Sequence, residues 1–198
     1  KGEQRRELGR QFGAWLAKKY GSVAKAANVW GGQARAEGDD FATRLVMPHP
    51  VWHLTQVQSG AMAKRLGDQL AFYTQLMHDF NTGIARFLKE EIGYKGLVNA
   101  GNWRTADQAK LLDAERYAYS ANDVIGVNRY YGADHTNPTN KGRAGYLISE
   151  GDLFSGHSVL KQPWAFPLAL RQVSGHPMII SESAWVPPLR YQTEGPFL

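Results

Sequence analysis

The chain contains no cysteine among its 198 residues. This absence excludes a disulfide-stabilised scaffold, a zinc site with thiolate ligands and a cysteine nucleophile. The sequence also lacks any apolar run near the roughly 18 residues that a membrane-spanning helix needs, so we expect no membrane partner. Neither G-x-G-x-x-G nor G-x-x-x-x-G-K-[ST] occurs, which argues against a phosphate-binding loop. We therefore expect a globular protein with no cofactor and no metal, whose chemistry is left to carboxylates.

The charge is positive but not concentrated. The formal net charge is +5, and the densest basic pairs, Arg5-Arg6 and Lys18-Lys19, share a predicted helix with Glu3 and Glu7. Mixed signs of this kind are typical of a solvated helix face, whereas nucleic-acid binding requires a contiguous basic surface. We expect no nucleic-acid partner.

Hydrophobic periodicity predicts several helices. Apolar residues repeat at helical spacing over residues 3–20, and Ser22 is placed to cap a second helix that ends at Gly31. A long helix is expected over 61–92, as one piece or with a break near 81–83, and Gly93 is a suitable C-cap. Two more helices are expected over 106–120 and 163–173, whereas 33–60 and 132–158 are predicted to be long connections.

Three short apolar segments between these helices are predicted to be buried strands, over residues 95–99, 123–128 and 177–181. Strands that alternate with helices indicate a parallel β/α architecture. Such an architecture is either a (β/α)8 barrel or an open doubly wound sheet. Both bind their ligands at the carboxyl ends of the strands.

Polar and aromatic residues follow each predicted strand at that end. Glu182 is the main catalytic candidate, because it ends an apolar strand beside an aromatic residue. Amide, hydroxyl and aromatic groups together suit a neutral polyol, which offers many hydrogen bonds and an apolar face. The predicted substrate-binding residues are Asn102, Trp103, Asn128, Tyr130 and Trp185.

Two other constellations are weaker. His49 and His53 are four residues apart, but Pro50 lies between them and no Glu follows His49, so a loop pair is favoured over a zinc site. Ser181, Ser183 and His176 lie near one another in sequence, but the G-x-S-x-G nucleophile elbow is missing, which argues against a serine triad.

The segment 12–30, FGAWLAKKYGSVAKAANVW, resembles the F-x-x-W-L-x-x-K-Y-G-S helix of clan A retaining glycoside hydrolases, especially the β-galactosidase-like members. In that family this helix follows the fourth barrel strand. Residues 176–185, HPMIISESAW, are similar to the seventh strand, which ends in the catalytic nucleophile. Residues 128–130 are similar to the sixth strand, whose Tyr commonly hydrogen-bonds the nucleophile.

This resemblance implies a partial (β/α)8 TIM barrel that runs from the helix after strand four to strand seven, with residues 1–198 as part of one catalytic domain. It assigns Glu182 as the nucleophile and Tyr130 as its hydrogen-bonding neighbour. The family's acid/base Glu follows an Asn, and this sequence contains no Asn-Glu pair. The resemblance therefore implies that strands one to four, strand eight and the acid/base lie outside this chain, which would be inactive alone.

The expected function is retaining hydrolysis of a glycosidic bond, with a carbohydrate substrate and with either the rest of the same barrel or a homo-oligomer as the protein partner. The alternative is a non-catalytic relative that binds carbohydrate or has a structural role. A secreted or periplasmic bacterial location is favoured over a cytoplasmic one. We expect the connections 33–60 and 132–158 to set substrate specificity, because loops at strand ends shape such sites.

Overall fold

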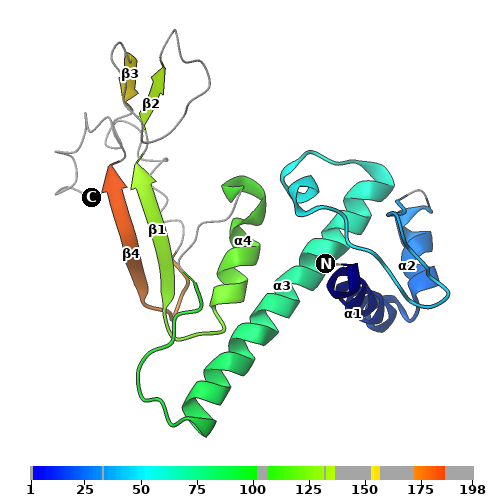
Figure 1. Ribbon diagram of the computed structural model, residues 1–198, viewed down its shortest axis with the longest axis horizontal. Helices are drawn as coiled ribbons and strands as arrows, with labels where there is room; N and C mark the ends of the chain where they lie inside the picture. Colours follow the sequence, from blue (N-terminus) through cyan, green and yellow to red (C-terminus); the bar gives the residue numbers. More distant parts are fainter. Residues whose placement is uncertain are drawn as a thin grey trace. The chain divides into compact units, whose positions relative to one another are not determined.

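Helices predominate in the described part of the chain (Figure 1). The computed structural model describes residues 2–32, 34–101, 107–131, 133–136, 153–156 and 172–185. The helices are α1 (Gly2–Tyr20), α2 (Val23–Trp30), α3 (Gly60–Arg86) and α4 (Gln108–Tyr119), with a 3-10 turn η1 (Val51–Thr55) and a π-helical turn η2 (Phe87–Glu91). The strands are β1 (Ile125–Tyr131), β2 (Ala133–Thr136), β3 (Leu153–Gly156) and β4 (Met178–Trp185).

The chain divides into two compact units. The first unit contains Lys1–Lys95 and Thr105–Ala121, and the second contains Gly96–Arg104 and Asn122–Leu198. All of the described helices belong to the first unit, and all of the described strands belong to the second. None of the described helices is long and apolar enough to cross a membrane.

The predicted (β/α)8 barrel is wrong. The described strands form two small sheets, a parallel pair β1–β4 and an antiparallel pair β2–β3. A barrel requires each strand to pair on both sides until the sheet closes, with matching tilt and stagger. Alternating helix and strand patterns specify the local elements, but they do not specify this closure.

The three predicted strands have different outcomes. Segments 123–128 and 177–181 overlap β1 and β4, which lie parallel, and both strands extend further than predicted, to Tyr131 and Trp185. The predicted burial is wrong for β4, because Ile179 and Ile180 are each 45% exposed. The extensions are rich in aromatic residues, which favour extended backbone. Segment 95–99 makes only one isolated parallel bridge, from Asn99 to Val124. Part of the predicted connection 132–158 forms β2 and β3, and residues 163–171 of the predicted helix lie outside the described residues.

The predicted helices of the first unit are confirmed. Ser22 caps α2 by accepting a hydrogen bond from the backbone N–H of Lys25 (3.1 Å), and Gly31 ends it in the left-handed conformation, with φ of 99°. α3 is unbroken to Arg86 and continues into η2, and Gly93 follows with φ of 74°. The apolar faces of α1, α2 and α3 meet in one core, in which Phe12 stacks on Phe72 with 5.1 Å between ring centroids.

Two buried carboxylates, those of Asp68 and Asp39, connect elements of the first unit by hydrogen bonds. Asp68 on α3 is buried and accepts hydrogen bonds from Lys19, Tyr20 and Trp30; the indole N–H of Trp30 is 2.7 Å away. These bonds join α3 to α1 and α2. A buried carboxylate is tolerated only when it is paired in this way.

Asp39 holds the connection between α2 and α3. Arg65, which is fully buried, donates to both carboxylate oxygens of Asp39, with N–O distances of 2.5 and 2.9 Å. The same guanidinium donates to the backbone carbonyls of Ala34 and Met47. The segment 33–60, predicted to shape a substrate site, is therefore anchored to α3 by a bidentate ion pair.

Candidate functional site

The candidate site is built on the parallel pair β1–β4 of the second unit. In this pair Asn128 on β1 is the register partner of Glu182 on β4. The amide Nδ2 of Asn128 donates a hydrogen bond to Oε2 of Glu182, and the hydroxyl of Ser181 donates to Oδ1 of the same amide (2.8 Å). Asn128 is 3% exposed, whereas Ser181 and Glu182 are exposed. An accessible carboxylate is thus held by a buried donor.

A β-bulge makes this arrangement possible. Val127 pairs with Ile180 and Asn128 pairs with Glu182, so Ser181 is the extra residue on β4. Side chains normally alternate between the two faces of a strand, and adjacent residues cannot both reach one neighbour. The extra residue shifts the alternation, so that Ser181 and Glu182 both contact Asn128. Bulges are over-represented beside active sites, where they redirect a side chain.

A second amide, that of Asn99, lies beside the beginning of β1. Oδ1 of Asn99 accepts hydrogen bonds from the backbone N–H groups of Gly126 (3.2 Å) and Gly101 (3.4 Å). A Cβ on residue 126 would lie 2.4 Å from Nδ2 of Asn99, so only glycine allows this contact. A glycine inside a predicted strand is an indication of such a close approach.

The sequence predictions for this site have mixed outcomes. Glu182 and Asn128, predicted from separate strand ends, are brought together. Tyr130 lies two residues beyond Asn128 on β1 and pairs with Ala184, and Trp185 pairs with Tyr131. Asn102 and Trp103 lie outside the described residues. The sequence indicates Ser181 only as a member of a serine triad, and it does not predict the contact with Asn128, because that contact depends on the bulge.

The weaker constellations gain no support. The rings of His49 and His53 are 5.8 Å apart, but within the described ranges no group of three or more potential metal ligands comes together. The hydroxyl of Ser181 donates to Asn128, and the ring of His176 contacts the carbonyl of Ser174 in its own turn. These contacts do not form the hydroxyl-to-imidazole bond of a serine triad.

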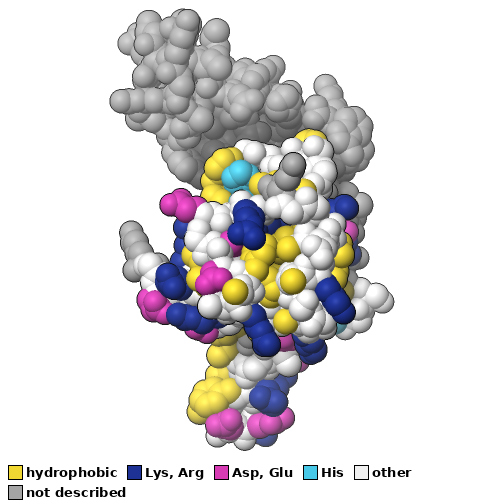
Figure 2. All heavy atoms as spheres, turned by 90° about the vertical axis from the view of Figure 1, so that its right-hand side faces the viewer, with side chains coloured by type: hydrophobic (Ala, Val, Ile, Leu, Met, Phe, Trp, Pro, Cys, Tyr) yellow, Lys and Arg dark blue, Asp and Glu magenta, His cyan; other side chains and the backbone are white. Residues whose placement is uncertain are grey.

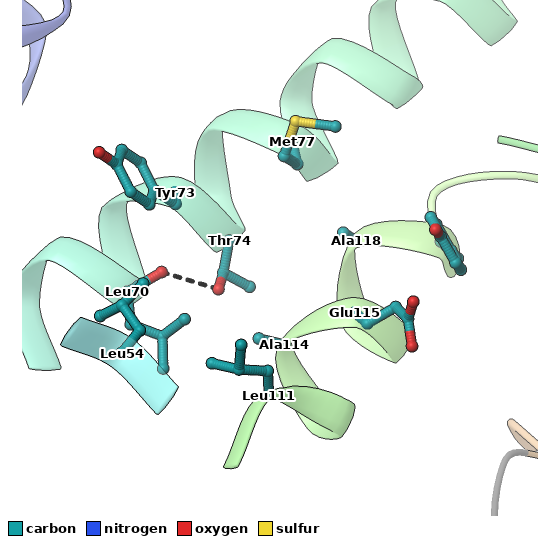
Figure 3. Close-up of a pocket in the computed structure, with 10 residues that line it drawn as sticks. Leu54, Leu70, Tyr73, Thr74, Met77, Leu111, Ala114, Glu115 and Ala118 are labelled. Carbon is teal, nitrogen blue, oxygen red and sulfur yellow. Dashed lines mark hydrogen bonds between the residues drawn. The ribbon is translucent and has the colours of Figure 1, made fainter. Parts of the chain in front are cut away.

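The first unit contains a separate apolar pocket of about 250 Å³ between α3, α4 and η1 (Figure 3). Leu54, Leu70, Met77 and Leu111 contribute to its lining. Thr74 offers a hydroxyl there, but this group donates to the carbonyl of Leu70 (2.8 Å). Tyr73, Glu115 and Tyr119 add polar groups to a lining that is otherwise mostly apolar and suits apolar packing.

The charged residues of the first unit are mixed in sign. Figure 2 shows Lys and Arg side chains interspersed with Asp and Glu over the face it displays. Arg10 forms ion pairs with Glu3 and Glu7, each at 2.8 Å. Arg10 therefore belongs to a solvated helix face with alternating charge, whereas Lys19 on the same helix pairs with the buried Asp68.

The chain matches no family model, and no curated protein or solved structure is significantly similar to it. The candidate site lies on β1 and β4. It consists of one exposed carboxylate, one buried amide donor and one hydroxyl on two parallel strands.

Proposed function

We propose that this chain supplies the nucleophile of a retaining glycoside hydrolase and that Glu182 is that nucleophile. The supporting observation is the hydrogen bond from the buried amide of Asn128 to the exposed carboxylate of Glu182. A donor of this kind restricts the orientation of a carboxylate. An accessible and oriented carboxylate is what nucleophilic attack on an anomeric carbon requires.

The proposed reaction has two steps. In the first, an oxygen of Glu182 forms a bond to the anomeric carbon, while the bond to the leaving oxygen breaks and a second carboxylic acid protonates that oxygen. In the second, the resulting carboxylate takes a proton from water, and the water oxygen displaces Glu182. Retaining enzymes hold the two carboxyl groups about 5–5.5 Å apart. We propose that the second carboxyl group, the acid/base, comes from outside residues 1–198. No (β/α)8 barrel is proposed.

The proposed substrate is a neutral carbohydrate. Amide and aromatic side chains are typical of sugar sites, because sugars combine hydroxyl groups with apolar ring faces. Asn102, Trp103, Tyr130 and Trp185 remain the proposed sugar contacts.

Substitution of the nucleophile in the full-length protein tests the proposal. Glu182→Gln keeps the size and removes the charge, so kcat/KM should fall by about 1000-fold or more. Glu90→Gln is the matched control, because Glu90 is exposed on η2 in the other unit. Activity near wild type in Glu182→Gln would contradict the assignment.

Covalent trapping provides the second measurement. A panel of 2-deoxy-2-fluoro glycosides with activated leaving groups should label wild type, and peptide mass spectrometry should locate the sugar on Glu182. The sugar configuration that labels fastest would define the substrate class. Sugar binding without turnover or labelling would instead indicate the non-catalytic carbohydrate binder.

A further inference from the structure

We propose that Ser181 is a positioning residue, which acts through Asn128 to fix the carboxylate of Glu182 for attack. This inference rests on the proposed function and deepens it. It assigns a role to the bulge on β4 and to a hydroxyl that the proposed chemistry does not use directly.

The directions of the two hydrogen bonds define the orientation of the Asn128 amide. A carboxylate only accepts hydrogen bonds, so the amide must present Nδ2 to Glu182. Oδ1 then faces Ser181, whose hydroxyl donates to it. The reversed amide would bring Oδ1 against the carboxylate, and two acceptors repel each other.

Burial makes the orientation of this amide important. Asn128 is 3% exposed, so water has little access to replace a lost partner. A buried acceptor without a hydrogen bond is destabilised by its lost solvation. Ser181 satisfies Oδ1 and so stabilises the rotamer in which Nδ2 faces Glu182. Without Ser181, the amide can rotate and its bond to the carboxylate weakens.

The bulge explains why the residue directly before the nucleophile can act in this way. In an unbroken strand Ser181 and Glu182 would face opposite sides, and only one of them could reach Asn128. The register shift between Val127 and Asn128 places both residues on that amide. Ser181 and Glu182, which are adjacent on β4, therefore both hold the amide of Asn128 on β1.

The test compares serine variants in the full-length protein. Ser181→Ala should lower kcat/KM by about tenfold, the size expected for one lost hydrogen bond, and mainly through kcat. Ser181→Thr retains the hydroxyl and should restore most of the activity. Ser174→Ala is the matched control, because Ser174 is exposed in the turn before β4. Asn128→Ala removes the donor itself and should lower the rate further.

Two readouts separate positioning from a structural effect. Ser181→Ala should lower kcat per active site, while KM and the fraction of active protein stay near those of wild type. A purely structural defect would instead lower the fraction of active protein, measured by covalent labelling with the fluoroglycoside, and leave kcat per active site unchanged.

The outcomes also separate this inference from the proposed function. If Glu182→Gln is inactive but Ser181→Ala has the kcat per active site of wild type, the positioning role is wrong and the nucleophile assignment stands. If Glu182→Gln keeps its activity, the proposed function fails first. A rate loss in Ser181→Ala that Ser181→Thr does not restore would also overturn the inference.

Discussion

The carbonyl oxygen of Arg44 lies directly over the α-carbon of Gly13. A Cβ built on Gly13 would lie 1.8 Å from that oxygen, a distance no pair of atoms can adopt without a backbone shift. Gly9, one turn earlier on α1, accepts a hydrogen bond from the N–H of Val46 (3.2 Å). Glycines four residues apart thus form a groove on α1 that receives the backbone of residues 44–46.

Gly13→Ala should destabilise the protein. Alanine favours a helix over glycine by about 1 kcal/mol, but the clash requires the Arg44 backbone to move, and overpacking of this kind costs about 1–3 kcal/mol or more. We expect a net loss of about 2 kcal/mol in the free energy of unfolding, measured by chemical denaturation. Gly67→Ala on α3 is the control and should be neutral or stabilising, because a Cβ there meets nothing within 4 Å. Equal effects of the two substitutions would contradict the groove.

Asp39→Asn should be strongly destabilising. The substitution leaves the guanidinium of Arg65 buried without its counter-charge, and breaking a buried ion pair from one side typically costs about 3–5 kcal/mol. The control is Asp113→Asn, because Asp113 is 97% exposed and its ion pair with Arg116 lies on the surface. Thermal or denaturant unfolding should separate the two variants clearly. A loss below about 1 kcal/mol in Asp39→Asn would show that the ion pair is not the anchor of segment 33–60.

Asp39 also predicts acid sensitivity. Burial alone would raise the pKa of its carboxyl, but the hydrogen bonds from Arg65 and from the N–H groups of Ala36 and Met47 outweigh burial and lower that pKa below its ordinary 3.8. A lowered folded pKa means that the stabilisation is fully present above the unfolded pKa and is lost progressively as the pH falls from there through the folded pKa, which denaturant unfolding at a series of acid pH values would measure.

His49 predicts a second loss of stability at a higher pH. Burial of its ring, together with the charges of Arg65 and His53, lowers the pKa of His49 below 6.5. The unfolded state then binds a proton more readily than the folded state, so stability should fall as the pH drops below about 6.5. His49→Asn should flatten the slope of unfolding free energy between about pH 6.5 and 5. His176→Asn, in the turn before β4, is the control; an unchanged slope in His49→Asn would contradict this origin.

The helices could be predicted from the sequence because the information that defines them is local. The apolar spacing of α1, the cap at Ser22 and the glycine at Gly31 act within a few residues, and the structure confirms them. The anchor between Asp39 and Arg65 could not be predicted, because it joins residues 26 positions apart that show no periodic pattern.

The positions of Asn128 and Glu182 on two strands could be predicted, because the apolar runs that indicate those strands are also local. An apolar run that ends in Glu182 indicates an accessible carboxylate at a strand end, and Asn128 follows from the same pattern on β1. The role of Ser181 and the barrel closure depend on which strands pair and in which register. Pairing is a property of two segments together, so a one-dimensional pattern leaves it open.

The bulge on β4 has a consequence for insertions and deletions. Side chains on a strand follow a period of two, so one added residue exchanges the two faces for everything that follows. The bulge absorbs such an extra residue: without Ser181, Glu182 would follow Ile180 directly and would still lie opposite Asn128. A single-codon deletion at this position should therefore remove the bulge and the hydroxyl, and leave the carboxyl-terminal half of β4 on its present faces.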